Sequence, residues 1–112
     1  MKIGIIVAMD KELVQLKGLL EESTVERRNK KDFILGSIDG KEIILQKCGI
    51  GKVNSAIGTV EMINNYSPDL IISTGVAGGA DDRMNVCDVV IGTEYRYHDA
   101  YCGDDCRFGQ IM

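Results

Sequence analysis

The segment Thr74–Gly79 constrains the fold of this chain more than any other feature of its sequence. It carries three glycines and follows a short apolar run, Leu70–Ser73, which itself follows Pro68 and Asp69. A short apolar run bounded by turn-forming residues is typical of a buried strand. Glycines directly after a strand let the backbone approach another group closely, and α/β folds bind small molecules at the carboxyl ends of their strands. The pattern therefore predicts an α/β domain with a ligand site at this loop.

Length and charge narrow the class of protein. The 112 residues suffice for one domain with a modest core, and we expect residues 1–112 to form a single domain. The net charge of -4 argues against a nucleic-acid or anionic-membrane partner, since both need a basic face. No apolar stretch approaches the length of a membrane span. The segment Met1–Val7 enters a strand-like run without the features of a signal peptide, so we expect a cytoplasmic protein.

The four cysteines do not suggest a disulfide framework in a chain that carries no export signal. Cys48 and Cys87 lie beside apolar residues, which predicts that both are small buried hydrophobes. Cys102 and Cys106 lie near His98, a spacing that can indicate a metal site, but a fourth ligand and a Cys-x-x-Cys pair are missing. We therefore predict no metal and no cofactor.

Hydrophobic periodicity predicts the first elements. Residues 2–8 read as a buried strand, and residues 10–22 as an amphipathic helix with Asp10 as its N-cap. The apolar positions of that helix are Leu13, Leu16, Leu19 and Leu20. The charged stretch Glu26–Lys31 is interpreted as a solvated turn or an exposed strand edge. Asp39 and Gly40 separate strands at 33–37 and 41–47, as in a tight hairpin.

The second half of the pattern sets the fold class. A helix over residues 52–65 has its apolar residues on one face and stops before Pro68. Strands are expected at 69–73 and 86–95. Strands that alternate with helices predict an α/β fold with a mixed, largely parallel central sheet flanked by helices. No element closes the sheet after residue 97, so we expect the front part of a larger fold, incomplete at its C-terminus.

The run Gly49-Ile50-Gly51-Lys52 matches no complete phosphate-binding motif. A P-loop needs a glycine where Gln46 stands and a Ser or Thr where Val53 stands, and a dinucleotide fingerprint needs a third glycine where Asn54 stands. Two interpretations remain open. The run is either only a tight turn from strand to helix, or a turn that also lines a ligand pocket through its backbone.

Five segments together resemble the bacterial 5′-methylthioadenosine/S-adenosylhomocysteine nucleosidases, members of the purine nucleoside phosphorylase superfamily. They occur in the family's order and spacing: Met1–Ile6, Ala8–Glu12, Gly49–Asn54, Ser73–Gly79 and Arg96–Ala100. The resemblance implies a nucleoside phosphorylase-like fold, of which this chain is the N-terminal part. It also implies an enzyme that cleaves the N-glycosidic bond of an adenine thionucleoside with water through an oxocarbenium-like transition state.

The resemblance assigns the site. Glu12 matches the glutamate that positions and activates the water, and its place near a helix N-terminus favours the ionised carboxylate. The substrate-binding positions implied by the family are Ala8, Met9, Ile50, Val76, Ala77 and Gly78. Some family members have serine at position 76, so valine removes one hydroxyl contact. Phe108 resembles the aromatic residue that one subunit lends to its neighbour, and Arg96–Asp99 is expected to fix a loop or a dimer contact rather than to supply acid–base chemistry.

Family members are much longer, and their later portion carries three further parts of the site. These are an aromatic residue that stacks on adenine, a Met-Glu pair that holds the ribose hydroxyls, and an aspartate that protonates the departing purine. Leaving-group protonation contributes roughly a hundredfold to ten-thousandfold. We therefore expect the 112-residue chain alone to hydrolyse adenine nucleosides negligibly. Uncovered sheet edges predict self-association, as a homodimer or by strand exchange.

Two alternatives remain open. The chain is another nucleoside-cleaving member of the superfamily, including a phosphorylase, or a non-catalytic fragment that binds nucleosides or oligomerises. A phosphorylase needs cationic or hydroxyl groups around phosphate, whereas the early chain offers only Lys2, Lys11 and Lys17, and Glu12 would repel phosphate. Water is therefore the favoured nucleophile.

Overall fold

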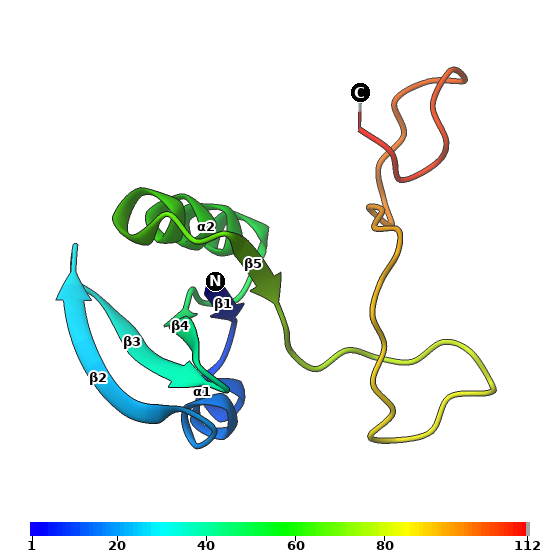
Figure 1. Cartoon of the computed structure of the whole chain (residues 1–112). Coiled ribbons are helices and arrows are strands. Elements are labelled where there is room, and N and C mark those ends of the chain that lie inside the picture. Colours follow the sequence, from blue (N-terminus) through cyan, green and yellow to red (C-terminus); the bar gives the residue numbers. More distant parts are fainter. Residues whose placement is uncertain (112) are drawn as a thin grey trace. The chain divides into compact units, whose positions relative to one another are not determined.

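A computed structural model describes residues 1–111 and divides the chain into two compact units, Met1–Ala77 and Gly78–Met112. The first unit holds a five-stranded sheet and two helices (Figure 1). In chain order these elements are β1 (Lys2–Val7), α1 (Asp10–Lys17), β2 (Glu21–Arg28), β3 (Lys31–Ile38), β4 (Lys41–Lys47), α2 (Lys52–Tyr66) and β5 (Leu70–Ser73). The single domain expected for residues 1–112 stays a prediction.

The sheet is mixed, with the strand order β2-β3-β4-β1-β5. β2, β3 and β4 form an antiparallel meander, while β1 pairs in parallel with β4 on one side and with β5 on the other. Asp39 and Gly40, both at positive φ, turn the chain between β3 and β4. The predicted α/β class with a mixed sheet is therefore confirmed, but the sheet is not largely parallel, because β2, β3 and β4 pair in the antiparallel sense. The parallel strands bring the carboxyl ends of β1, β4 and β5 to one edge of the sheet.

Alternating side chains build a hydrophobic core on each face of the sheet. Ile5 and Val7 of β1 point to one face and Ile6 to the other, as expected from the period of two in a strand. The first face packs against the leucines of α1, and the second against Met62 of α2. Figure 1 shows the two helices on opposite sides of the sheet. Because each helix packs on one face of the sheet, α1 and α2 both begin next to the edge at which the parallel strands β1, β4 and β5 end.

The sequence-based boundaries hold for most of the first unit. The strands expected at 2–8 and 69–73, the hairpin around Asp39 and the helix at 52–65 are confirmed. The burial expected for Leu70–Ser73 is wrong, because β5 is an edge strand on which Leu70 and Ile72 are exposed. The helix expected at 10–22 is shorter, because it ends at Lys17 before Gly18. Its N-cap is Met9 rather than Asp10. The stretch Glu26–Lys31 is an exposed strand edge that runs into the turn between β2 and β3, so both interpretations of it apply in part.

The apolar face of α2 does not pack against the core of the first unit. The residues of α2 that are buried on the sheet are Gly58 and Met62. Val53, Ile57, Val60 and Ile63, which share a face in the sequence pattern, remain exposed, with Val53 at 73%. The first unit therefore presents an apolar helix surface that the described residues of that unit do not cover.

The second unit contains no helix or strand among its described residues, 78–111. The strand expected at 86–95 is therefore wrong, and its apolar side chains are exposed, with Val86 at 95% and Val89 at 91%. A strand needs a neighbouring strand for its backbone hydrogen bonds, whereas the backbone bonds here include turns such as Asp88 N to Asn85 O, 3.1 Å. Cys87, expected to be buried, is exposed because it lies in this segment, while Cys48 is half-buried.

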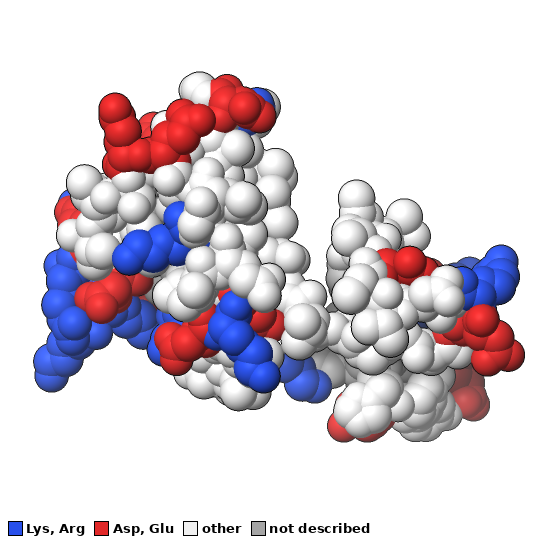
Figure 2. Space-filling view, turned by 90° about the horizontal axis from the view of Figure 1, so that it is seen from below, with Lys and Arg blue, Asp and Glu red and all other residues white. Residues whose placement is uncertain are grey.

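Acidic and basic side chains lie beside each other on the face drawn in Figure 2. Ion pairs of the first unit include Arg27–Asp32 at 3.0 Å and Lys31–Glu61 at 2.8 Å. Neither of the helices found in residues 1–111 has the length and apolar character that crossing a bilayer requires.

Candidate functional site

A cavity of about 470 Å³ opens at the carboxyl edge of the parallel strands. The strand ends are joined there by backbone hydrogen bonds from Cys48 N to Val7 O, 2.9 Å, and from Thr74 N to Ile6 O, 3.2 Å. The cavity is lined by the ends of β1 and β5, the start of α2 and the turns between them, namely Ile6, Val7, Ala8, Glu12, Cys48, Gly49, Gly51, Lys52, Ser55, Ser73, Thr74, Gly75, Val76 and Ala77. This is the edge at which open α/β sheets bind ligands.

Three backbone N–H groups hold the carboxylate of Glu12 in this cavity. Ala8 N and Met9 N donate to Oε2 over 3.1 and 3.0 Å, and Val76 N donates to Oε1 over 3.1 Å. Met9 is the N-cap of α1 and Ala8 directly precedes it, while Val76 belongs to the loop after β5. Glu12 therefore joins the start of α1 to the glycine loop, although Val76 lies 64 residues away in the chain.

The surroundings of Glu12 favour its charged form. The hydrogen bond from Val76 N–H is the largest influence that holds the pKa of Glu12 below its ordinary value of 4.5. Partial burial acts in the opposite direction, while the N–H groups of Met9 and Ala8 and the charge of Lys11 lower the pKa further. The carboxylate is therefore ionised at neutral pH. A carboxylate offers about four lone-pair directions. The described residues 1–111 donate to three of them, which leaves one direction on Oε1 for a water molecule.

This arrangement predicts a pH-dependent contribution of Glu12 to stability. Because the pKa of Glu12 is lowered on folding, its contribution is present above the ordinary value of 4.5 and is lost as the pH falls through the lower value of the folded state. We expect the stability difference between the chain and its Glu12→Gln variant to be constant near pH 7 and to change below pH ~4.5. Urea unfolding at a series of pH values measures it. A difference that is the same at all pH values would contradict the proposed hydrogen bonds.

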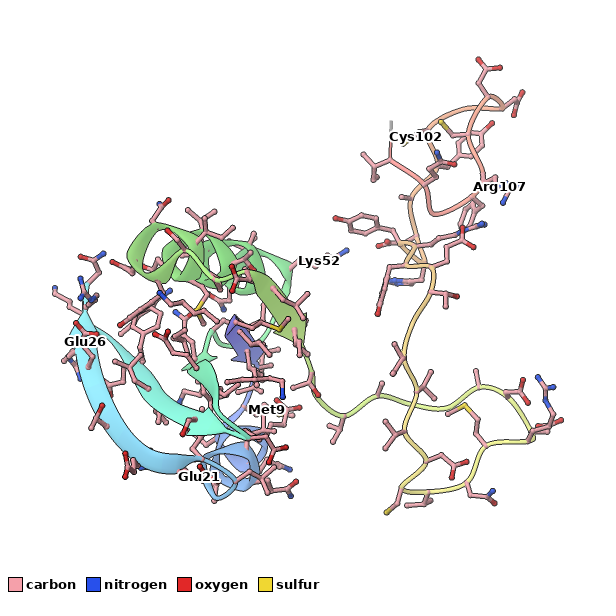
Figure 3. All side chains as sticks on the ribbon, viewed as in Figure 1. Met9, Glu21, Glu26, Lys52, Cys102 and Arg107 are labelled. Atoms are coloured by element: carbon pink, nitrogen blue, oxygen red, sulfur yellow. The ribbon has the colours of Figure 1, made fainter. Side chains whose placement is uncertain are left out.

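The turn between β4 and α2 brings backbone and polar groups to the opposite wall of the cavity. Gly49 and Gly51 adopt φ values of +97° and +102°, which are strained for other residues, and this lets the chain reverse into α2. Lys52 and Ser55 follow in the first turns of the helix, and Figure 3 shows Lys52 at its beginning. Of the two interpretations of Gly49–Lys52, the structure supports the turn that also lines a pocket.

The site residues expected from the sequence fall into three groups. Ala8, Glu12, Val76 and Ala77 line the cavity. Met9 and Ile50 are neighbours of lining residues but are not themselves among them; Met9 contributes its N–H to Glu12, and the Ile50 side chain is largely exposed. Gly78 begins the second unit and is described with that unit.

Several lining residues escape the sequence interpretation. Cys48 and Ser55 were not expected in the site. Thr74 and Gly75 belong to the loop Thr74–Gly79, where a ligand site was expected, although neither was named as a substrate-binding residue. A usable signal exists for Ser55, a polar residue one turn into a helix that follows a glycine-rich turn. For Gly75 the signal is its place in a glycine-rich loop after a strand, but the sequence does not indicate that its neighbour in space is Glu12.

The second unit carries the remaining candidates. Phe108 is exposed, and Arg96 pairs with Glu94. The His98 imidazole lies 3.7 Å from the Asp99 carboxylate, and both side chains are exposed, as a surface pair would be. Within residues 1–111, no group of three or more His, Cys, Asp or Glu side chains is placed to hold a metal ion.

Comparisons with known proteins agree with this geometry. The family model of the phosphorylase superfamily matches residues 2–109. The 5′-methylthioadenosine/S-adenosylhomocysteine nucleosidase of Bacillus licheniformis is 42% identical over 99% of this chain and 48% of its own length. That of Halalkalibacterium halodurans is 50% identical over 88% of this chain and 42% of its own. The chain thus spans about half the length of these relatives.

Solved structures of nucleosidases also superpose on this chain. The nucleosidase of Colwellia psychrerythraea in complex with adenine superposes with a TM-score of 0.90 and 36% identity, over 99% of this chain and 46% of the other. That of Streptococcus pneumoniae with a transition-state inhibitor gives 0.91 and 35%, over 99% and 49%. Family match, sequence identity and superposition lead to one conclusion: this chain belongs to the phosphorylase superfamily.

Proposed function

We propose that this chain carries the water-activating part of a hydrolase that cleaves the N-glycosidic bond of 5′-methylthioadenosine and S-adenosylhomocysteine and releases adenine. One observation carries the proposal: the Glu12 carboxylate is held in its ionised form, by three backbone N–H groups, at the wall of a cavity at the carboxyl edge of the sheet. The names of the similar proteins supply the substrate class.

Glu12 acts on both the attacking water and the ribose of the substrate. The lone-pair direction left on Oε1 accepts a hydrogen bond from a water molecule. As the oxygen of that water bonds to the anomeric carbon of the ribose, the carboxylate takes a proton from it, and the bond from that carbon to the adenine nitrogen breaks, with its electron pair leaving on adenine. The negative charge of Glu12 also stabilises the positive charge that develops on the ribose. The backbone N–H groups keep the carboxylate fixed, so little reorganisation is needed during the reaction.

Cleavage by water is favoured over cleavage by phosphate. Lys52 is the one cationic residue among those that line the described cavity, and the ionised Glu12 stands in the same cavity and repels a phosphate dianion. The hydroxyl groups of Ser55, Ser73 and Thr74 also line it and suit the ribose as well as they suit an anion. We therefore propose a nucleosidase rather than a phosphorylase.

The test is adenine release from 5′-methylthioadenosine in phosphate-free buffer. Two proteins are compared: the 112-residue chain, and a chimaera in which residues 1–109 replace the matching part of the Bacillus subtilis relative, 42% identical over 99% of this chain. We expect release by the chimaera and negligible release by the 112-residue chain alone. Release that requires added phosphate would establish a phosphorylase instead. A folded chimaera with no release under either condition would assign these residues to a non-catalytic nucleoside-binding or oligomerising role.

We also propose that the chain self-associates, as a homodimer or by strand exchange. β5 is an edge strand in the described sheet, so one side of its backbone is unpaired there, and the exposed apolar face of α2 belongs to the same unit. Light scattering over a range of concentrations should give a mass above 12.3 kDa. Val60→Glu should lower that mass, whereas Val14→Glu on α1, whose side chain is also exposed, serves as the control. A monomer at all concentrations would contradict the proposal.

A further inference from the structure

Gly75 lies against the carboxylate of Glu12. A Cβ atom at position 75 would stand 2.7 Å from Oε1 and 3.2 Å from Cδ of Glu12, both closer than ordinary contacts. The three heavy atoms nearest to that Cβ position all belong to the Glu12 carboxyl group. The close approach at Gly75 is therefore to the Glu12 carboxylate, rather than to a backbone or core atom.

The space at Gly75 decides which hydrogen bond Glu12 makes. Oε1, the atom that a side chain at position 75 would displace, accepts the N–H of the next residue, Val76. Oε2 is bound by Ala8 and Met9 on the side of α1 and has a longer distance, 3.5 Å, to the Cβ position. A methyl group at position 75 would thus break the bond to Val76 first, while the bonds to the start of α1 remain available.

We propose that Gly75 is a positioning residue for Glu12: its missing side chain lets Oε1 reach the N–H of Val76, which orients the carboxylate toward the cavity. The proposal rests on the function proposed above for Glu12, but its geometry does not depend on the substrate. Gly75→Ala should leave the fold intact, because the displaced group is the end of a flexible side chain. It should release Oε1 from Val76.

NMR titration of the 112-residue chain tests the proposal without any substrate. In the unchanged chain, the amide resonance of Val76 should move with pH at the pKa of Glu12, together with those of Ala8 and Met9. In Gly75→Ala, the Val76 resonance should lose this pH dependence, and the pKa of Glu12 should rise toward 4.5 because its largest lowering influence is gone. Lys11, whose charge acts on Glu12, and Lys52, which lines the same cavity, are unchanged in the variant.

Gly79→Ala is the matched control. It adds the same methyl group in the same glycine-rich segment, but there the Cβ atom meets Met84 at an ordinary distance of 3.5 Å. In Gly79→Ala, the pH dependence of the Val76 amide resonance and the pKa of Glu12 should equal those of the unchanged chain. Equal titration in Gly75→Ala would overturn the proposal, and so would loss of the folded sheet in that variant, since this would give Gly75 a role in the fold. Because no product is measured, an inactive chain leaves the test valid.

Discussion

Replacing Glu12 with glutamine is expected to slow adenine release by the chimaera by roughly a hundredfold to ten-thousandfold. Glutamine keeps the length of the side chain and one acceptor oxygen, so the bond to Val76 or those to Ala8 and Met9 can persist. It removes the proton acceptor for the attacking water and the negative charge that opposes the developing positive charge on the ribose. Initial rates over a range of 5′-methylthioadenosine concentrations measure the effect, which should appear in kcat.

The control for this loss is Glu21→Gln. Glu21 is an exposed carboxylate at the start of β2, so its replacement changes the net charge by the same amount outside the cavity. We expect the rate of this variant to equal that of the unchanged chimaera. A Glu12→Gln variant that retains most of its activity would show that another group activates the water, and the proposed role of Glu12 would be wrong.

The parts of the fold that were predicted correctly are those whose sequence pattern is local. Ile5, Ile6 and Val7 face alternate sides of the sheet, and the turn at Asp39 and Gly40 fixes the register of β3 with β4. β2 shows the limit of this approach. Its sequence, from Glu21 to Arg28, is mostly polar, and it becomes a strand because β3 offers backbone partners to Glu21 and, after an irregularity, to Thr24–Arg28.

The opposite error occurs in the second unit. Residues 86–95 have the apolar pattern of a strand, but the described residues of that unit provide no strand to pair with them. A period of two describes which side chains suit a sheet, whereas pairing is a property of two segments. Local patterns therefore predict strands well only where the partner strand is also present.

The site, like the fold, was predicted in part: single residues could be selected from the sequence, but the contact between them could not. Resemblance to a family, rather than spacing or composition, selected Glu12 from the chain's acidic residues. The glycine loop after β5 was expected at a ligand site because it follows a short apolar strand. What the sequence could not indicate is the contact between the two, because Glu12 and Val76 meet only after β1 and β5 pair and α1 packs on the sheet.

Gly58→Ala should destabilise the chain by about 2 kcal/mol, although alanine in a helix interior normally stabilises by about 0.5–1 kcal/mol relative to glycine. The sign reverses because Gly58, in the middle of α2, faces the turn that leads out of β4. A Cβ atom there would lie 2.5 Å from Cβ of Cys48, and that atom is attached directly to the backbone and cannot rotate away. Chemical denaturation measures the change in the free energy of unfolding.

A double-mutant cycle identifies the cause of that loss. Cys48→Gly removes the clashing Cβ atom, so Gly58→Ala in that background should regain its ordinary sign and stabilise the helix. Cys48→Ala keeps the Cβ atom and removes only the sulfur, which lies 3.3 Å from the Val7 carbonyl, so it should not relieve the clash. A coupling that appears with glycine but not with alanine at position 48 assigns the effect to one pair of carbon atoms. If Gly58→Ala lowered the free energy of unfolding equally in the unchanged chain, in Cys48→Gly and in Cys48→Ala, α2 would not approach β4 as closely as this contact requires. Cys48 and Gly49, which line the cavity, would then be held by other contacts.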